Sequence, residues 1–123
     1  MLRSLLVLPL AFSLFGCGPP LVWGGEKATK DRLLGIVPEG STVSVLEAEA
    51  MSRRWRVSNR DDRTFEKGLA HYFGGGCKYQ GGVTRTVIVA EYGVLTTTVE
   101  TVWLFDASGE LSALCVRRTT DAP

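Results

Sequence analysis

Alternating apolar and polar residues dominate the C-terminal part of the chain, and this spacing is typical of β-strands. The segments 83–92, 95–105 and 111–119 are rich in Val, Thr, Leu and Ile, and turn residues separate them. Three such segments in succession predict an antiparallel meander. The last turn, 106–109, begins with Asp and ends with Gly, which is the composition of a type I hairpin turn.

Both faces of the last two predicted strands carry apolar side chains. Strict alternation places these residues of the middle strand on one face: Val99, Thr101, Trp103 and Phe105, with Glu100, Val102 and Leu104 opposite. On the last strand the same rule groups Leu111, Ala113 and Cys115, with Leu114 and Val116 opposite. We therefore expect a helix to cover one side of the sheet and a loop or a partner to cover part of the other.

Residues 43–53 show helical rather than strand-like spacing. Their apolar positions are separated by three, four and one residues, which places them close to one helical face: Val43, Leu46, Ala50 and Met51. The hydroxyls at positions 41 and 42 are suited to cap the first turn, and the arginines at 53 and 54 complement the dipole at the other end. The pattern predicts one capped helix that ends near residue 54.

Between this helix and the meander, the segment 55–58 alternates and predicts a short strand with Trp55 and Val57 pointing inward. No period persists from residue 60 to 82, where glycines are frequent. A loop of this length inside a small domain is often functional. The predicted fold class is therefore α+β, with one capped helix packed on an antiparallel sheet of three to four strands and a long glycine-rich loop.

The N-terminus has the layout of an export signal. Arg3 precedes an apolar run over 5–15 that is interrupted only by Ser13, and Gly16 and Cys17 follow. The run is shorter than the roughly 20 apolar residues that span a bilayer. Leu14, Gly16 and Cys17 resemble the lipobox of bacterial lipoproteins. The resemblance implies a signal peptide over 1–16, lipid attachment at Cys17, and a protein anchored in the bacterial cell envelope.

The residue after the lipobox cysteine is Gly18, which resembles lipoproteins sorted to the outer membrane, facing the periplasm. Prolines and glycines in the following stretch favour a lipidated N-terminus and flexible tether over 17–35, before a single α+β domain over 36–123. Removal of Arg3 with the signal leaves 13 of the 14 basic residues against 13 acidic ones. This balance argues against a nucleic-acid partner.

Three cysteines are present, and assigning Cys17 to lipid leaves Cys77 and Cys115 as a pair. In an oxidising compartment such a pair is expected to form a disulfide, the alternative being two buried free thiols. One histidine, His71, and no cysteine pair at ligand spacing argue against a metal site. We expect neither a metal nor another cofactor.

Two segments resemble a known family. The stretch IVPEGST at 36–42 and the stretch LFDASGEL at 104–111 are similar to the helix opening and the closing hairpin of the small outer-membrane lipoproteins of the barrel-assembly machinery (SmpA/OmlA type). More loosely, they resemble the fold shared with proteinaceous β-lactamase inhibitors. The resemblance implies a helix-on-sheet scaffold, although the sequence pattern lacks a counterpart of the family's second capped helix.

The candidate partner-binding residues are Tyr72 and Phe73 in the long loop, and Arg54, Arg56 and Arg60 in a region of excess positive charge. The alternative for these arginines is a solvated edge with local Arg–Asp pairs.

We predict a membrane-anchored, non-enzymatic module that binds an envelope protein or has a structural role. A second hypothesis is an inhibitor or immunity-type protein that plugs an enzyme cleft. The third is an envelope hydrolase, which would need a convergent Ser, His and Asp or a metal, and the single histidine, His71, argues against it. His71 with Cys77 as base and nucleophile lacks a placed Asn or Asp.

Overall fold

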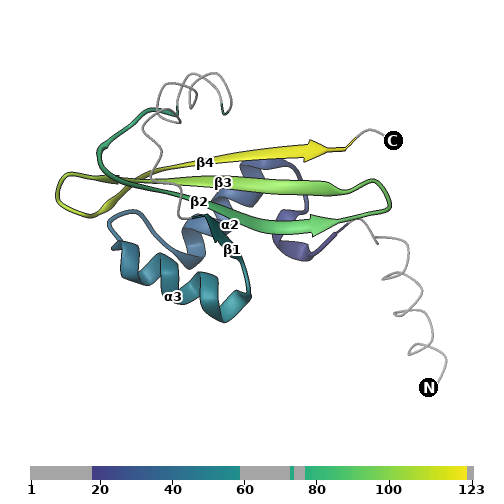
Figure 1. Cartoon of the computed structure of the whole chain (residues 1–123), viewed down its shortest axis with the longest axis horizontal. Helices are drawn as coiled ribbons and strands as arrows, with labels where there is room; N and C mark the ends of the chain where they lie inside the picture. Colours follow the sequence, from purple (N-terminus) through teal and green to yellow (C-terminus); the bar gives the residue numbers. More distant parts are fainter. Residues whose placement is uncertain (1–17, 59–72, 74–76, 122–123) are drawn as a thin grey trace, which may run out of the picture.

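The computed structural model describes residues 18–58, Phe73 and residues 77–121. Within these ranges, two α-helices pack on a four-stranded antiparallel sheet (Figure 1). The elements in chain order are the 3-10 turn η2 (Pro20–Val22), α2 (Glu26–Ile36), α3 (Val43–Arg53), β1 (Arg56–Ser58), β2 (Gly81–Tyr92), β3 (Thr97–Asp106) and β4 (Leu111–Thr120). The strand order β1-β2-β3-β4 confirms the predicted α+β class and the antiparallel meander.

α3 begins and ends where the spacing of apolar residues predicts. Leu46 and Ala50 are buried, and the helix closes on Arg54, which adopts a left-handed conformation with φ of 60°. Thr42 stands at the N-cap in an extended conformation but makes no side-chain cap. Its backbone instead forms a bridge with Glu110, so the entry to α3 is fixed by the β3–β4 turn.

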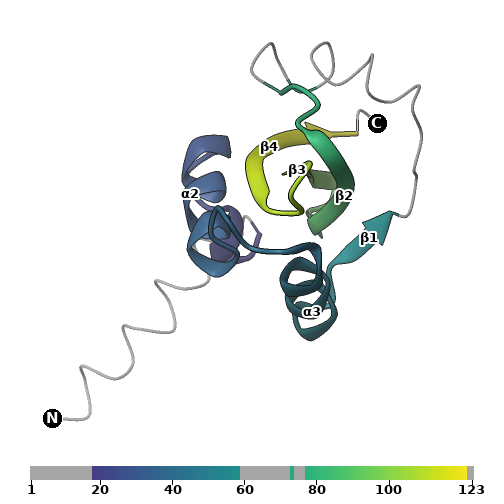
Figure 2. The ribbon, with the colours of Figure 1, turned by 90° about the vertical axis from the view of Figure 1, so that its left-hand side faces the viewer.

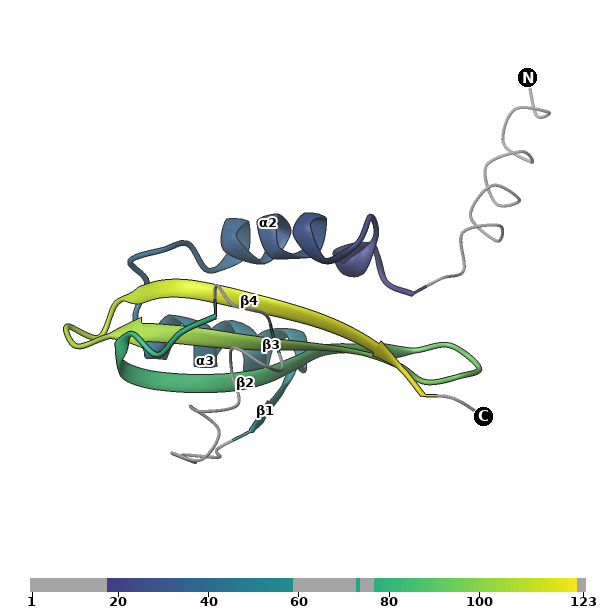
Figure 3. The ribbon, with the colours of Figure 1, turned by 90° about the horizontal axis from the view of Figure 1, so that it is seen from above.

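α2 is a second helix where the sequence analysis expected a tether. Its apolar face is narrow, with only Thr29 and Leu33 buried, so its own pattern is weak. Packing of these residues along β4 supplies the stability that short helices lack in isolation (Figure 3). The expectations of one helix and of a flexible tether are therefore wrong over residues 20–35, and Cys17 lies outside the described residues.

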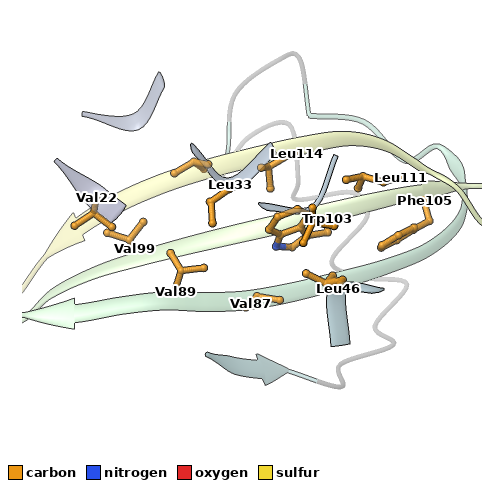
Figure 4. Packing of buried hydrophobic residues seen from close by; sticks show 12 residues of the cluster. Val22, Leu33, Leu46, Val87, Val89, Val99, Trp103, Phe105, Leu111 and Leu114 are labelled. Carbon is orange, nitrogen blue, oxygen red and sulfur yellow. The ribbon is translucent and has the colours of Figure 1, made fainter. Parts of the chain in front are cut away.

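The main core lies between the sheet and the two helices, as Figure 4 shows. Trp103 and Phe105 of β3 are fully buried at its centre, and Leu33 from α2 and Leu46 from α3 close over them. Burying each such aliphatic side chain contributes about 1.5–3 kcal/mol. Figure 2 shows both helices on this side of the sheet, as predicted for one of its faces.

A β-bulge changes the predicted facing of β4. Leu104 pairs with Ala113 and Phe105 pairs with Leu111, so Ser112 has no partner. Because of the extra residue, the Leu111 side chain packs in the main core, while Ala113 lies on the opposite face of the sheet. The prediction that Leu111 shares a face with Ala113 and Cys115 is wrong because strict alternation stops at this bulge.

Candidate interaction surface

The sheet face turned away from the helices, called here the second face, is divided into a covered half and an open half. At the covered half, Val102 and Leu104 are 0% exposed. Phe73 and Cys77 pack on them together with Cys115. Two residues that precede β2, Phe73 and Cys77, therefore cover this half of the face.

A disulfide joins Cys77 to Cys115 with a Cα–Cα distance of 6.0 Å, as the cysteine count predicts. It attaches the segment that precedes β2 to the edge strand β4. Cys77 is almost completely buried, so the bridge is part of the packing of the covered half. The residues that cover this half of the second face are consequently attached to β4 by a covalent bond.

Few of the residues that the sequence places in the long loop belong to the part of the chain that the structure describes. Phe73 is half-buried against the cluster of Val102 and Leu104. Gly81 and Gly82, expected in the loop, belong to β2. Tyr72, Arg60 and His71 lie outside the described residues.

The predicted arginine cluster is divided among different environments. Arg53 contacts Glu49 at 3.0 Å and lies 5.9 Å from the ring centroid of Trp55. Arg56 on β1 forms an ion pair with Glu91 on β2. Arg54 is exposed at the end of α3. Local pairs of this kind contribute little to stability, and they reduce the excess positive charge that the sequence suggested.

The open half of the second face carries charges of both signs. The register places Arg56 opposite Ile88, Glu91 opposite Thr98, and Glu100 opposite Arg117. All of these side chains are partly or fully accessible to solvent. The strands thus present a surface on which acidic and basic groups alternate around a half-buried isoleucine.

The β3–β4 turn is closed by a carboxylate. Oδ1 of Asp106 accepts hydrogen bonds from the Ser108 hydroxyl at 2.6 Å, the Ser108 amide at 3.0 Å and the Glu110 amide at 3.1 Å. The Ser108 hydroxyl, followed by the Glu110 amide, lowers the pKa of Asp106 below its ordinary value. This explains why Asp is suited to the first position of the turn, as the sequence analysis predicted.

Another exposed apolar group was missed by the sequence analysis. Val94 and Leu95 lie in the β2–β3 turn, with exposures of 105% and 46%. Polar residues are usual in tight turns. The two adjacent aliphatic residues in this turn were therefore the sequence feature that could have identified the exposed apolar group.

No helix in the described ranges is long and apolar enough to cross a bilayer. Among the same residues, no group of three or more His, Cys, Asp or Glu side chains is arranged to hold a metal ion. Comparisons with protein-family models, curated proteins and solved structures found no match to this chain.

Proposed function

We propose that the protein is a lipid-anchored lipoprotein of the bacterial envelope that binds another envelope protein through the open half of the second face, without a catalytic role. The observation that carries the proposal is the Cys77–Cys115 disulfide. It points to an oxidising compartment, and it attaches the segment before β2 to β4 beside the proposed binding surface.

Disulfides persist outside the cytosol and are rare inside it. The bridge therefore supports export, which the signal-like N-terminus predicts independently. It also uses Cys77 and Cys115 and leaves Cys17 for the lipid. The two arguments are independent because one concerns the first residues of the chain and the other concerns the folded domain.

The arrangement of the helices supports the helix-on-sheet scaffold that the family resemblance implies. The resemblance to the SmpA/OmlA lipoproteins lacked a second helix in the sequence pattern. α2 now precedes α3, and the sheet follows both helices. α2 carries no side-chain cap, and the glycine-rich, cysteine-bearing loop remains a departure from the family.

The chemistry of the open half favours a protein partner. Charges of both signs alternate across neighbouring strands, as at Glu100 and Arg117. Such a surface matches a complementary protein surface better than a ligand with one sign of charge. The disulfide in the covered half restrains the neighbouring open half before a partner binds. Less conformational entropy is then lost on binding.

Two experiments test the proposal. Growth with a fatty-acid analogue should label the wild-type protein and fail to label a Cys17→Ala variant. Unchanged labelling of the variant would refute the anchor.

The surface is tested by placing a photo-crosslinking residue at Ile88 or Thr98 in intact cells, with Lys30 on α2 as the matched exposed control. We expect positions 88 and 98 to give an adduct with the same partner protein, and position 30 to give none. An adduct from position 30 alone would place the interface elsewhere. A captured enzyme that loses activity in the adduct would identify the second candidate, an inhibitor.

A further inference from the structure

The beginning of the described chain is fixed to the end of the β2–β3 hairpin. Gly18 has a φ of +95°, and a Cβ at this position would lie 2.8 Å from Cε2 of Tyr92. The indole Nε1 of Trp23 donates a hydrogen bond to the Gly18 carbonyl at 2.8 Å. In Figures 1 and 3 the start of the described chain, the β2–β3 turn and the end of β4 lie at the same end of the sheet.

The residues that follow Gly18 are also attached to the domain. Val22 is 1% exposed in the main core. The guanidinium group of Arg118 donates to the Val22 carbonyl, and that of Arg32 donates to the carbonyls of Leu21 and Trp23. The chain between Gly18 and α2 is thus held in place by packing and by two arginine side chains.

Cys17 is joined to Gly18 by one peptide bond, and consecutive Cα atoms are about 3.8 Å apart. Lipid on Cys17 therefore places the membrane surface next to the β2–β3 turn. A long tether would have allowed the domain any orientation, whereas this attachment allows few.

The same end exposes apolar side chains. Val94 and Leu95 project from the turn, with exposures of 105% and 46%, and Trp23 is 37% exposed. Tryptophan favours the membrane interface because its ring is apolar and its N–H is polar. The hairpin turn and Trp23 together form the hairpin end, defined here as Trp23, Val94 and Leu95.

We infer that the hairpin end rests in the interfacial layer of the bilayer that holds the lipid on Cys17. This inference depends on the proposed lipid anchor. The anchor residue lies beside the turn, so insertion of its lipid brings the bilayer to this end of the domain. This favours a bilayer over a protein as the group that contacts the hairpin end. The lipid supplies the attachment, and the hairpin end sets the orientation of the domain on the membrane.

The experiment uses the full chain, processed in cells, purified in mild detergent and reconstituted into phosphatidylcholine vesicles that contain a spin-labelled lipid quencher. A fluorophore is attached at Val94→Cys, with Val45→Cys on α3 as the matched control of similar side-chain type. The bridged cysteines do not react with the label. We expect at least a twofold larger fractional quenching at position 94 than at position 45.

Equal quenching at the two positions in protein that carries the fatty acid would overturn the inference and leave the anchor intact. Absence of the fatty acid would instead refute the proposed function. A Val94→Asp/Leu95→Asp variant labelled at Thr96→Cys gives a second measurement. It should remain on the vesicles but lose most of the quenching that the Thr96→Cys protein shows without those substitutions.

Discussion

A pair of hydrogen bonds inside the main core offers a sharp test of the packing. The indole Nε1 of Trp103 donates to Oγ1 of Thr101 at 2.8 Å, and the Thr101 hydroxyl donates to the Val87 carbonyl at 2.7 Å. Trp103 and Thr101 are both 0% exposed. The threonine hydroxyl is therefore the group that allows the indole N–H to be buried.

Thr101→Val keeps the shape of the side chain and removes the hydroxyl. Because the indole N–H can only donate, it loses its acceptor in a place that water does not reach. An unsatisfied buried donor costs about 1–3 kcal/mol. We expect the free energy of unfolding to fall by that amount, with little contribution from a cavity because the volume is nearly unchanged.

Urea unfolding followed by circular dichroism measures this loss. Thr98→Val on the second face, where the side chain is half-buried, is the matched control and should change stability by less than about 0.5 kcal/mol. In a Trp103→Phe background no indole N–H remains, so Thr101→Val should cost much less there. A loss at Thr101 no larger than at Thr98, or one unchanged in the Phe background, would refute this account of the core.

Three further predictions concern the frame of the sheet. Replacing Cys77 and Cys115 by Ala should lower the free energy of unfolding by about 4 kcal/mol, since the bridge spans a separation of 38 residues; a loss below about 1 kcal/mol in urea unfolding would contradict this. Gly82→Ala should destabilise by about 3 kcal/mol because its Cβ would overlap the Asp106 carbonyl, whereas Gly35→Ala, in open space on α2, should stabilise by up to about 1 kcal/mol. Because the pKa of Asp106 is lower in the folded state, its contribution is complete above the unfolded pKa and is lost as the pH falls below about 4; Asp106→Asn should flatten the decline in thermal stability over that range, and an unchanged slope would contradict the turn geometry.

The elements that the sequence predicted correctly are those whose pattern is local. The strands of the meander, α3 and the turn at Asp106 follow from alternation, helical spacing and turn composition. The disulfide followed from the number of cysteines together with the expected compartment. In each case the relevant information lies within a short segment or in a simple count.

The features that were missed depend on contacts between distant residues. α2 has few apolar residues and is stabilised by β4, which lies far away in the chain. The facing of Leu111 depends on a bulge that only the pairing with β3 produces. The proximity of Gly18 to Tyr92 likewise joins residues that lie far apart in the sequence, and no local pattern encodes it.

The disulfide has a consequence for proteolysis. Cys77 and Cys115 close a covalent ring that contains all of β2 and β3. Val94, the most exposed aliphatic residue among those that the structure describes, lies at the turn between these strands. A protease that cuts this turn opens the ring but does not divide the molecule. The two pieces stay joined by the sulfurs and by the ladder of the sheet, so the nicked protein would migrate as one chain until it is reduced. The bond that braces the domain therefore also keeps it in one piece after a cut at this turn.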